Sequence, residues 1–118
     1  MLDAADLEDG GRDDRYRVDR ASLMFLGAYH FVGDEAELLE GYRRLLGGYP
    51  PGSLDLQVCI RTADGLTVFD ACPSEEVFRS FSASAELAAA IVAAGLPSPT
   101  AEPLGDVQAA EVTRQFRP

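Results

Sequence analysis

The sequence predicts an α+β domain in which one sheet carries its helices on a single face. Segments with strand and helix character follow the order strand, helix, strand, strand, helix, strand. Two of the strand segments are apolar on both alternating sides, which is typical of central strands. The 118 residues are enough for one domain, and apolar residues, at 47% of the chain, are enough for a core.

The first segment, residues 1–20, is rich in aspartate, glutamate and arginine and poor in apolar side chains. Such a segment buries too little apolar surface to offset the entropy lost on ordering, which predicts a flexible acidic arm. The alternative is that Tyr16 and Val18 dock against a sheet edge and extend it as an extra strand.

The folded unit is expected over residues 21–105, and it opens with an apolar run, LMFLGAYHFV, over residues 23–32. This run predicts a strand covered from both sides. A helix should follow, because Asp34 and Glu37 have the spacing of a capping box and leucines recur at helical spacing. Gly47 and Gly48 should end it.

The next two strands are predicted as a hairpin around the sequence ADG at residues 63–65. The first of them alternates with period two, which predicts a half-buried strand at a sheet edge. Its apolar side holds Val58 and Ile60, and its polar side holds Arg61. The second, GLTVFDAC, is apolar on both sides apart from Asp70.

A second helix should begin at Ser74, which is a good N-cap, and end at Gly95. The sequence SFSAS at residues 80–84 interrupts good helix formers, so a bend is expected there. The last strand is expected over residues 100–104, and Pro103 restricts it to a sheet edge or a strand end. The tail, residues 106–118, could wrap a partner subunit or fray.

The order of elements is that of ferredoxin-like βαββαβ folds, with a four-stranded, antiparallel-type sheet. Right-handed crossovers place both helices on one face, which leaves the other face bare. A second copy packed sheet against sheet is the simplest cover for an apolar face of that size, so a homodimer is expected. The alternative cover is the arm together with the tail.

The formal net charge of −10 argues against nucleic acid and anionic membrane surfaces as partners. The sequence has no apolar run of membrane-spanning length and no signal-peptide pattern near residue 1, so the cytoplasm is the expected location. Cys59 and Cys72 lie in apolar runs and are expected to be small buried residues. No metal cluster, phosphate-binding loop or nucleophile elbow is present in the sequence, so no cofactor is expected.

His30, the single histidine, and Asp70 are the candidate catalytic pair. We expect the first and third strands to be parallel neighbours, which would bring His30 and Asp70 to the same end of the sheet. Asp70 would then orient an imidazole that gives or takes a proton. The alternative is a strand-end histidine with a satisfied hydrogen bond, with Asp70 as a turn or cap partner.

Aromatic side chains could line a substrate pocket between the sheet and the helices. The candidates are Tyr29, Tyr42, Phe78 and Phe81, with Cys72 beside them. The alternative for the aromatic residues is plain core packing. Arg61 could hold a carboxylate or phenolate, or could form an exposed ion pair on an edge strand.

The segment GLTVFDACPSEEVFRSF, followed by AAGLP, resembles the dimeric α/β-barrel superfamily, which includes the antibiotic-biosynthesis-monooxygenase-like proteins. The resemblance covers residues 24–104 and is greatest to small actinobacterial members. It implies a homodimeric barrel and a cofactor-independent cyclase, isomerase or monooxygenase acting on an aromatic or polyketide-like compound. A shared fold does not fix function.

Two functions therefore remain open. The first is the cofactor-independent enzyme, with a small apolar organic substrate and His30 moving the proton. The second is a non-catalytic homodimer that binds a small ligand or a protein partner. An open cavity with His30 pointing into it would favour the enzyme, and a closed, packed space would favour the binding protein.

Overall fold

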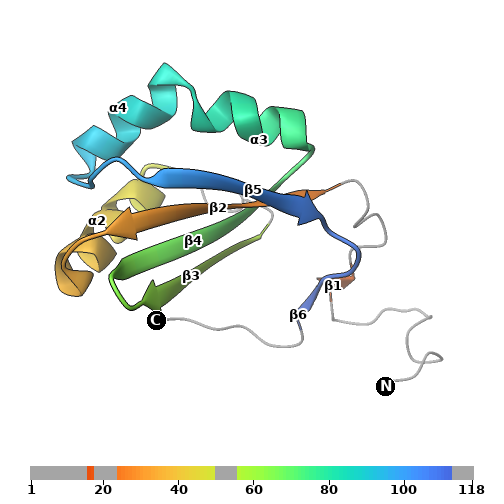
Figure 1. Cartoon of the computed structure of the whole chain (residues 1–118), viewed down its shortest axis with the longest axis horizontal. Coiled ribbons are helices and arrows are strands. Elements are labelled where there is room, and N and C mark those ends of the chain that lie inside the picture. The colour runs from red at the N-terminus through yellow and green to blue at the C-terminus, as the bar shows by residue number, and fades with distance from the viewer. Residues whose placement is uncertain (1–15, 18–23, 50–55, 113–118) are drawn as a thin grey trace.

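The computed structural model describes residues 16–17, 24–49 and 56–112, and these form an α+β fold (Figure 1). Their strands are β1 (Tyr16–Arg17), β2 (Phe25–Val32), β3 (Gln57–Thr62), β4 (Gly65–Cys72), β5 (Thr100–Asp106) and β6 (Glu111–Val112). Their helices are α2 (Glu35–Gly47), α3 (Glu75–Ser82) and α4 (Ala85–Ala93).

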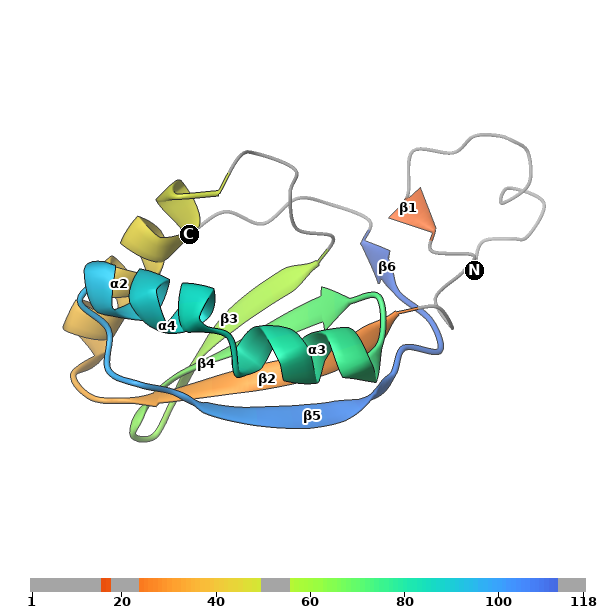
Figure 2. The ribbon, with the colours of Figure 1, turned by 90° about the horizontal axis from the view of Figure 1, so that it is seen from above.

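The main sheet has the strand order β3-β4-β2-β5, and every neighbouring pair is antiparallel. Seen from above, α3 and α4 follow one another across the sheet, with α2 beside α4 (Figure 2). The predicted four-stranded antiparallel sheet is confirmed, and the arrangement is compatible with a ferredoxin-like fold.

The expectation that the first and third strands run parallel is wrong. β2 and β4 are antiparallel neighbours, with His30 opposite Thr67 and Gly27 opposite Asp70. The helix α2 leads from β2 to β3, and β4 enters between these two strands and runs opposite to both. The C-terminal ends of β2 and β4 therefore lie at opposite ends of the sheet.

The core lies between the helices and one face of the sheet. The strand β2 contributes Phe25, Tyr29 and Phe31 to it, as its alternation predicts. Phe78 of α3 is 2% exposed and packs against Phe25 and Tyr29, with ring centroids 5.9 and 5.4 Å apart. Its ring lies over Gly27, where no side chain intervenes.

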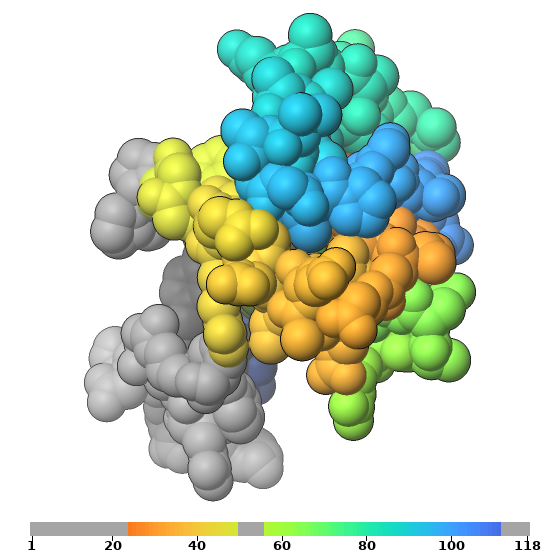
Figure 3. Space-filling model, turned by 90° about the vertical axis from the view of Figure 1, so that its left-hand side faces the viewer, coloured from red at the N-terminus to blue at the C-terminus, as the bar shows by residue number. Residues whose placement is uncertain are grey.

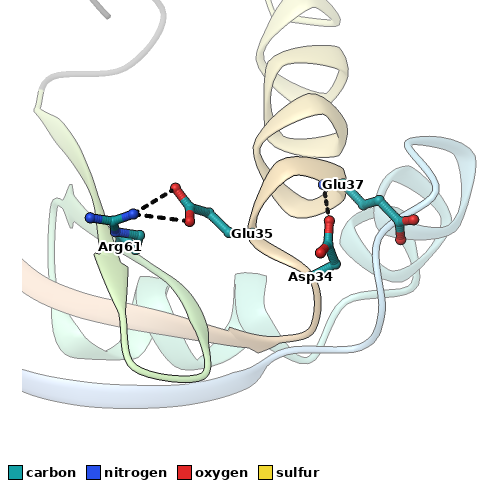
Figure 4. Close-up of polar contacts among 4 residues, drawn as sticks. All are labelled: Asp34, Glu35, Glu37 and Arg61. Carbon is teal, nitrogen blue, oxygen red and sulfur yellow. Dashed lines mark hydrogen bonds and ion pairs between the residues drawn. The ribbon is translucent and has the colours of Figure 1, made fainter.

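The first helix has the predicted ends. The Asp34 side chain accepts a hydrogen bond from the Glu37 backbone amide at 3.1 Å, which satisfies a free donor of the first turn (Figure 4). Gly47 is the last helical residue and Gly48 the C-cap. These local signals set the two ends of α2, which packs against β4.

The sequence predicts one helix from Ser74 to Gly95, with a bend at residues 80–84. The structure has two helices there, α3 and α4, and the chain leaves the helical conformation between them. The Ser84 hydroxyl caps α4 by accepting from the Leu87 amide at 3.1 Å, as Ser74 caps α3. Gly95, with a φ of 78°, ends α4 in the left-handed region that favours glycine. At this end of the molecule α4 rests against α2 (Figure 3).

The edge strand β3 presents its apolar side away from the helices. Val58 and Ile60 lie on the open face and are 45% and 42% exposed, whereas Gln57 and Cys59 face the helices. The period-two pattern predicted the edge position correctly. The helices therefore cover the polar side of the strand and leave its apolar side on the open face.

The opposite edge of the sheet is β5, which contains Pro103 as predicted. An edge position suits a residue that has no amide hydrogen to donate. The β3–β4 hairpin turns through Ala63 and Asp64, between the paired residues Thr62 and Gly65, in agreement with the ADG signal.

The chain segments before and after the main sheet pair with each other. Tyr16 is opposite Val112 and Arg17 is opposite Glu111 in an antiparallel two-stranded ribbon. The arm therefore contributes a short strand, but it pairs with the tail rather than with the edge of the main sheet. The rest of the arm, including Val18, lies outside the described residues. None of the helices in the described residues is long and apolar enough to cross a membrane.

Candidate functional site

A hollow of about 70 Å³ lies between α2, the sheet and the α3–α4 pair. Its walls are mainly apolar and aromatic side chains from all of these elements. They are Tyr29, Phe31, Tyr42, Leu45, Leu46, Tyr49, Gln57, Val68, Asp70, Phe81, Leu87 and Ile91. Ligand sites typically combine such apolar walls with a few placed polar groups.

The polar groups of this pocket come from neighbouring positions of β3 and β4. Gln57 lies directly opposite Asp70 in the strand register, and both side chains face the helices. The Tyr42 hydroxyl donates a hydrogen bond to Gln57 Oε1 at 2.7 Å. Burial, with smaller contributions from Cys59 and Asp70, raises the pKa of Tyr42 to about 12. Tyr42 therefore remains a neutral phenol at neutral pH.

Asp70 is the acidic group of the pocket. It is 8% exposed and stands near the end of β4, between apolar residues of the strand. Its charge also raises the pKa of two of the pocket tyrosines, Tyr29 and Tyr42, although burial is the larger cause for each.

A second hollow, of about 230 Å³, lies between the α3–α4 pair and β5. It shares Tyr29, Leu87 and Ile91 with the first hollow, so these three side chains separate the two spaces. Together the hollows provide about 300 Å³, which is near the lower end of small-molecule sites, roughly 300–1,000 Å³.

The structure brings together four of the residues predicted for the site. Asp70, Tyr29, Tyr42 and Phe81 all line the first hollow. Phe78 does not line it, because its ring is buried between β2 and α3 as plain core.

His30 lies on the other face of the sheet. Asp70 is opposite Gln57 and Gly27, whereas His30 is an odd number of positions away along β2, so the two side chains project to opposite faces. The expected contact between His30 and Asp70 is therefore wrong.

The contacts of His30 on the open face are polar. Its Nδ1 lies 2.9 Å from Thr67 Oγ1, and its Nε2 lies 2.7 Å from Glu102 Oε1. These contacts match the alternative of a strand histidine with satisfied hydrogen bonds.

Arg61 and Cys72 also lie outside the pocket walls. Arg61 Nη1 donates to both carboxylate oxygens of Glu35, at 3.1 and 3.3 Å, in the exposed ion pair of Figure 4. Cys72 Sγ lies 3.3 Å from the carbonyl oxygen of Ser74. Burial raises the pKa of Cys72 and of Cys59, which favours the neutral thiols.

Sequence reasoning missed Gln57 and Tyr49 as pocket residues. In the period-two pattern Gln57 shares the polar side of the edge strand with Arg61, and that side faces the helices. Tyr49 follows the glycine pair that ends α2, in a stretch with turn character. The position of Gln57 opposite Asp70 in a predicted hairpin is the signal that could have identified it.

The described residues contain no group of three or more histidine, cysteine, aspartate or glutamate side chains that could hold a metal ion. No family model matches the sequence, and a search of the curated proteins finds no match.

Proposed function

We propose that this chain is a cofactor-independent isomerase or cyclase that moves a proton on a small, largely apolar ring compound in the helix-side pocket. The observation that carries the proposal is Asp70, a nine-tenths buried carboxylate in the wall of a mainly apolar and aromatic hollow. The resemblance to the dimeric α/β-barrel superfamily, with its ferredoxin-like fold, supports the same class of reaction.

Asp70 takes the role of proton acceptor in this proposal. A positioned general base typically contributes about 10²–10⁴-fold to a rate. The aromatic and leucine side chains around Asp70 hold the ring of the substrate and exclude water. His30, on the opposite face, has no part in this step.

The size of the site limits the substrate. A dry cavity of about 150 Å³ holds a molecule as large as benzene, and the first hollow alone is about half of that. A single ring beside Asp70 therefore requires Tyr29, Leu87 and Ile91 to move apart, so that the ring can extend into the second hollow.

Proton abstraction can be tested without knowledge of the natural substrate. In deuterated water, the protein should accelerate exchange of the protons next to the carbonyl of cyclohexanone or 1-indanone, followed by proton NMR. Asp70→Asn should lower the acceleration by about 10²-fold or more, because an amide is not a base of useful strength. Asp106→Asn, the same change on exposed β5, should leave it unchanged.

Binding of the ketones to Asp70→Asn, followed by ligand NMR, shows that the variant retains a folded pocket. Three results would overturn the proposed function. They are no acceleration by the unmodified protein with any ketone tested, the same acceleration by Asp70→Asn, and loss of acceleration in His30→Ala with Asp70→Asn unaffected.

The open sheet face supports a second proposal, that the chain forms a homodimer through this face. Val58 and Ile60 lie exposed there. Within the described strands, the charged side chains that the register places on this face are His30 and Glu102, which contact each other. A molecule with a net charge of −10 can therefore approach its copy through this face with little like-charge repulsion.

If the chain dimerises through this face, two valine variants should differ in their mass in solution. Light scattering at micromolar concentration should give about twice the chain mass of 12.7 kDa. Val58→Asp should raise the dissociation constant at least about 100-fold, because an unpaired charge is costly to bury. Val77→Asp on α3 should leave the mass unchanged, although Val77 is 42% exposed and Val58 45%. A monomer mass for the unmodified protein, or equal masses for both variants, would contradict this proposal.

A further inference from the structure

The hydroxyl of Tyr29 is a buried polar group to which the rest of the described structure offers no hydrogen bond. Tyr29 is 8% exposed, and its hydroxyl oxygen is inaccessible to solvent and lacks a partner among the described residues. Most buried polar atoms in proteins have such a partner, and one left without it destabilises the fold. An unpartnered hydroxyl at a hollow therefore indicates a group that a ligand can use.

Tyr29 lies where the two hollows meet, so a ligand that moves the neighbouring side chains apart can reach this hydroxyl. Its side chain lines both hollows, and it projects from the middle of β2, the central strand, where neighbours on both sides hold the backbone. Phe78 packs against its ring. The group is thus held at the junction of the two spaces.

The Tyr29 hydroxyl can serve only as a phenol, and not as a phenolate, at neutral pH. Burial raises the pKa of Tyr29 well above its usual value, and the nearby Asp70 raises it further. A neutral phenol can donate one hydrogen bond, and the group that accepts it must carry a lone pair.

We propose that the ligand of this pocket is a neutral carbonyl compound whose oxygen accepts a hydrogen bond from the Tyr29 hydroxyl. This inference rests on the proposed function and names its substrate class. A carbonyl oxygen supplies an acceptor for the Tyr29 hydroxyl, and the hydrocarbon ring packs against the apolar walls of the pocket. A carboxylate ligand is disfavoured, because the charge of Asp70 would repel it in a poorly solvated site.

Tyr29 and Asp70 then have complementary roles. Asp70 takes a proton from the carbon beside the carbonyl, and the electron pair of that C–H bond becomes the carbon–carbon double bond of an enolate. The negative charge moves to the carbonyl oxygen, which the Tyr29 hydroxyl holds. Return of a proton to the same carbon, or to a conjugated one, regenerates the carbonyl and the Asp70 carboxylate. A donor placed where charge develops lowers the barrier to this step.

The test compares Tyr29→Phe with the unmodified protein, using 1-indanone and indane, which differ by the carbonyl oxygen. Tyr29→Phe should weaken binding of 1-indanone about 3–10-fold, the usual range for one neutral hydrogen bond, and should leave binding of indane unchanged. The carbonyl carbon of ¹³C-labelled 1-indanone should shift downfield on binding to the unmodified protein, and this shift should shrink with Tyr29→Phe.

The outcomes separate this inference from the proposed function. If Tyr29→Phe weakens both ligands equally, or leaves the carbonyl shift in place, the donor role is wrong even where Asp70→Asn still abolishes proton exchange. If ketones bind and show the Tyr29-dependent shift but no exchange is accelerated, the reaction is wrong and the ligand class stands. If neither ligand binds, both are wrong.

Discussion

Replacing Gly27 by alanine is expected to lower the free energy of unfolding by about 3 kcal/mol, at the upper end of the usual cost of overpacking a core. A Cβ at this position would lie 2.1 Å from Cε1 of Phe78, well inside contact distance. The Phe78 ring cannot withdraw, because it is buried between Phe25 and Tyr29. At roughly 4–8 °C per kcal/mol for a domain of this size, the midpoint of thermal unfolding should fall by about 12–24 °C.

Gly105→Ala is the matched control for this substitution. Gly105 lies in β5 of the same sheet, and a Cβ there would meet nothing within 4 Å. That variant should be neutral or more stable by about 0.4–1 kcal/mol, because alanine restricts the unfolded chain. Phe78→Leu should reduce the cost of Gly27→Ala when the two are combined. Equal midpoints for Gly27→Ala and Gly105→Ala would contradict the packing described here.

Gly65→Ala is expected to destabilise the fold by a similar amount, about 3 kcal/mol, for a different reason. A Cβ at Gly65 would lie 1.9 Å from the backbone oxygen of Phe31. No side-chain rotation relieves this contact, because the backbone of β4 fixes the position of the Cβ and the oxygen belongs to the backbone of the paired strand β2. Urea denaturation should show the loss of stability.

Amide hydrogen exchange locates the effect of Gly65→Ala. The largest acceleration of exchange should occur where β2 meets the start of β4, around Val32 and Leu66. The amides of α3 should accelerate only as much as the loss of global stability requires. A uniform acceleration across the domain would show that the strand contact is not the origin of the loss.

The sequence was sufficient for the features that depend on local interactions. Asp34 and Ser74 cap their helices through backbone amides only three residues away, so the pattern needs no knowledge of the rest of the fold. The two-sided apolar character of β2 likewise predicted its central place in the sheet.

The site depended on features that alternation does not encode. Whether His30 and Asp70 meet is decided by the direction and register of β2 against β4, and both were unknown. In the same way, the alternation of β3 separates Val58 from Gln57 but does not say which of them the helices cover. Alternation shows that one side of β3 is apolar. It does not show whether that apolar side packs against the helices or lies on the open face of the sheet.

The strand order also determines when the fold can be completed during synthesis. The central strand β2 is made first among the four strands of the main sheet, yet one of its neighbours, β5, begins only at Thr100. Thr100 is translated about 70 residues after His30, a delay of roughly 4–14 s at 5–20 residues per second. During that interval the nascent chain has one edge of its most apolar strand without a neighbour, a state prone to wrong pairing with other chains.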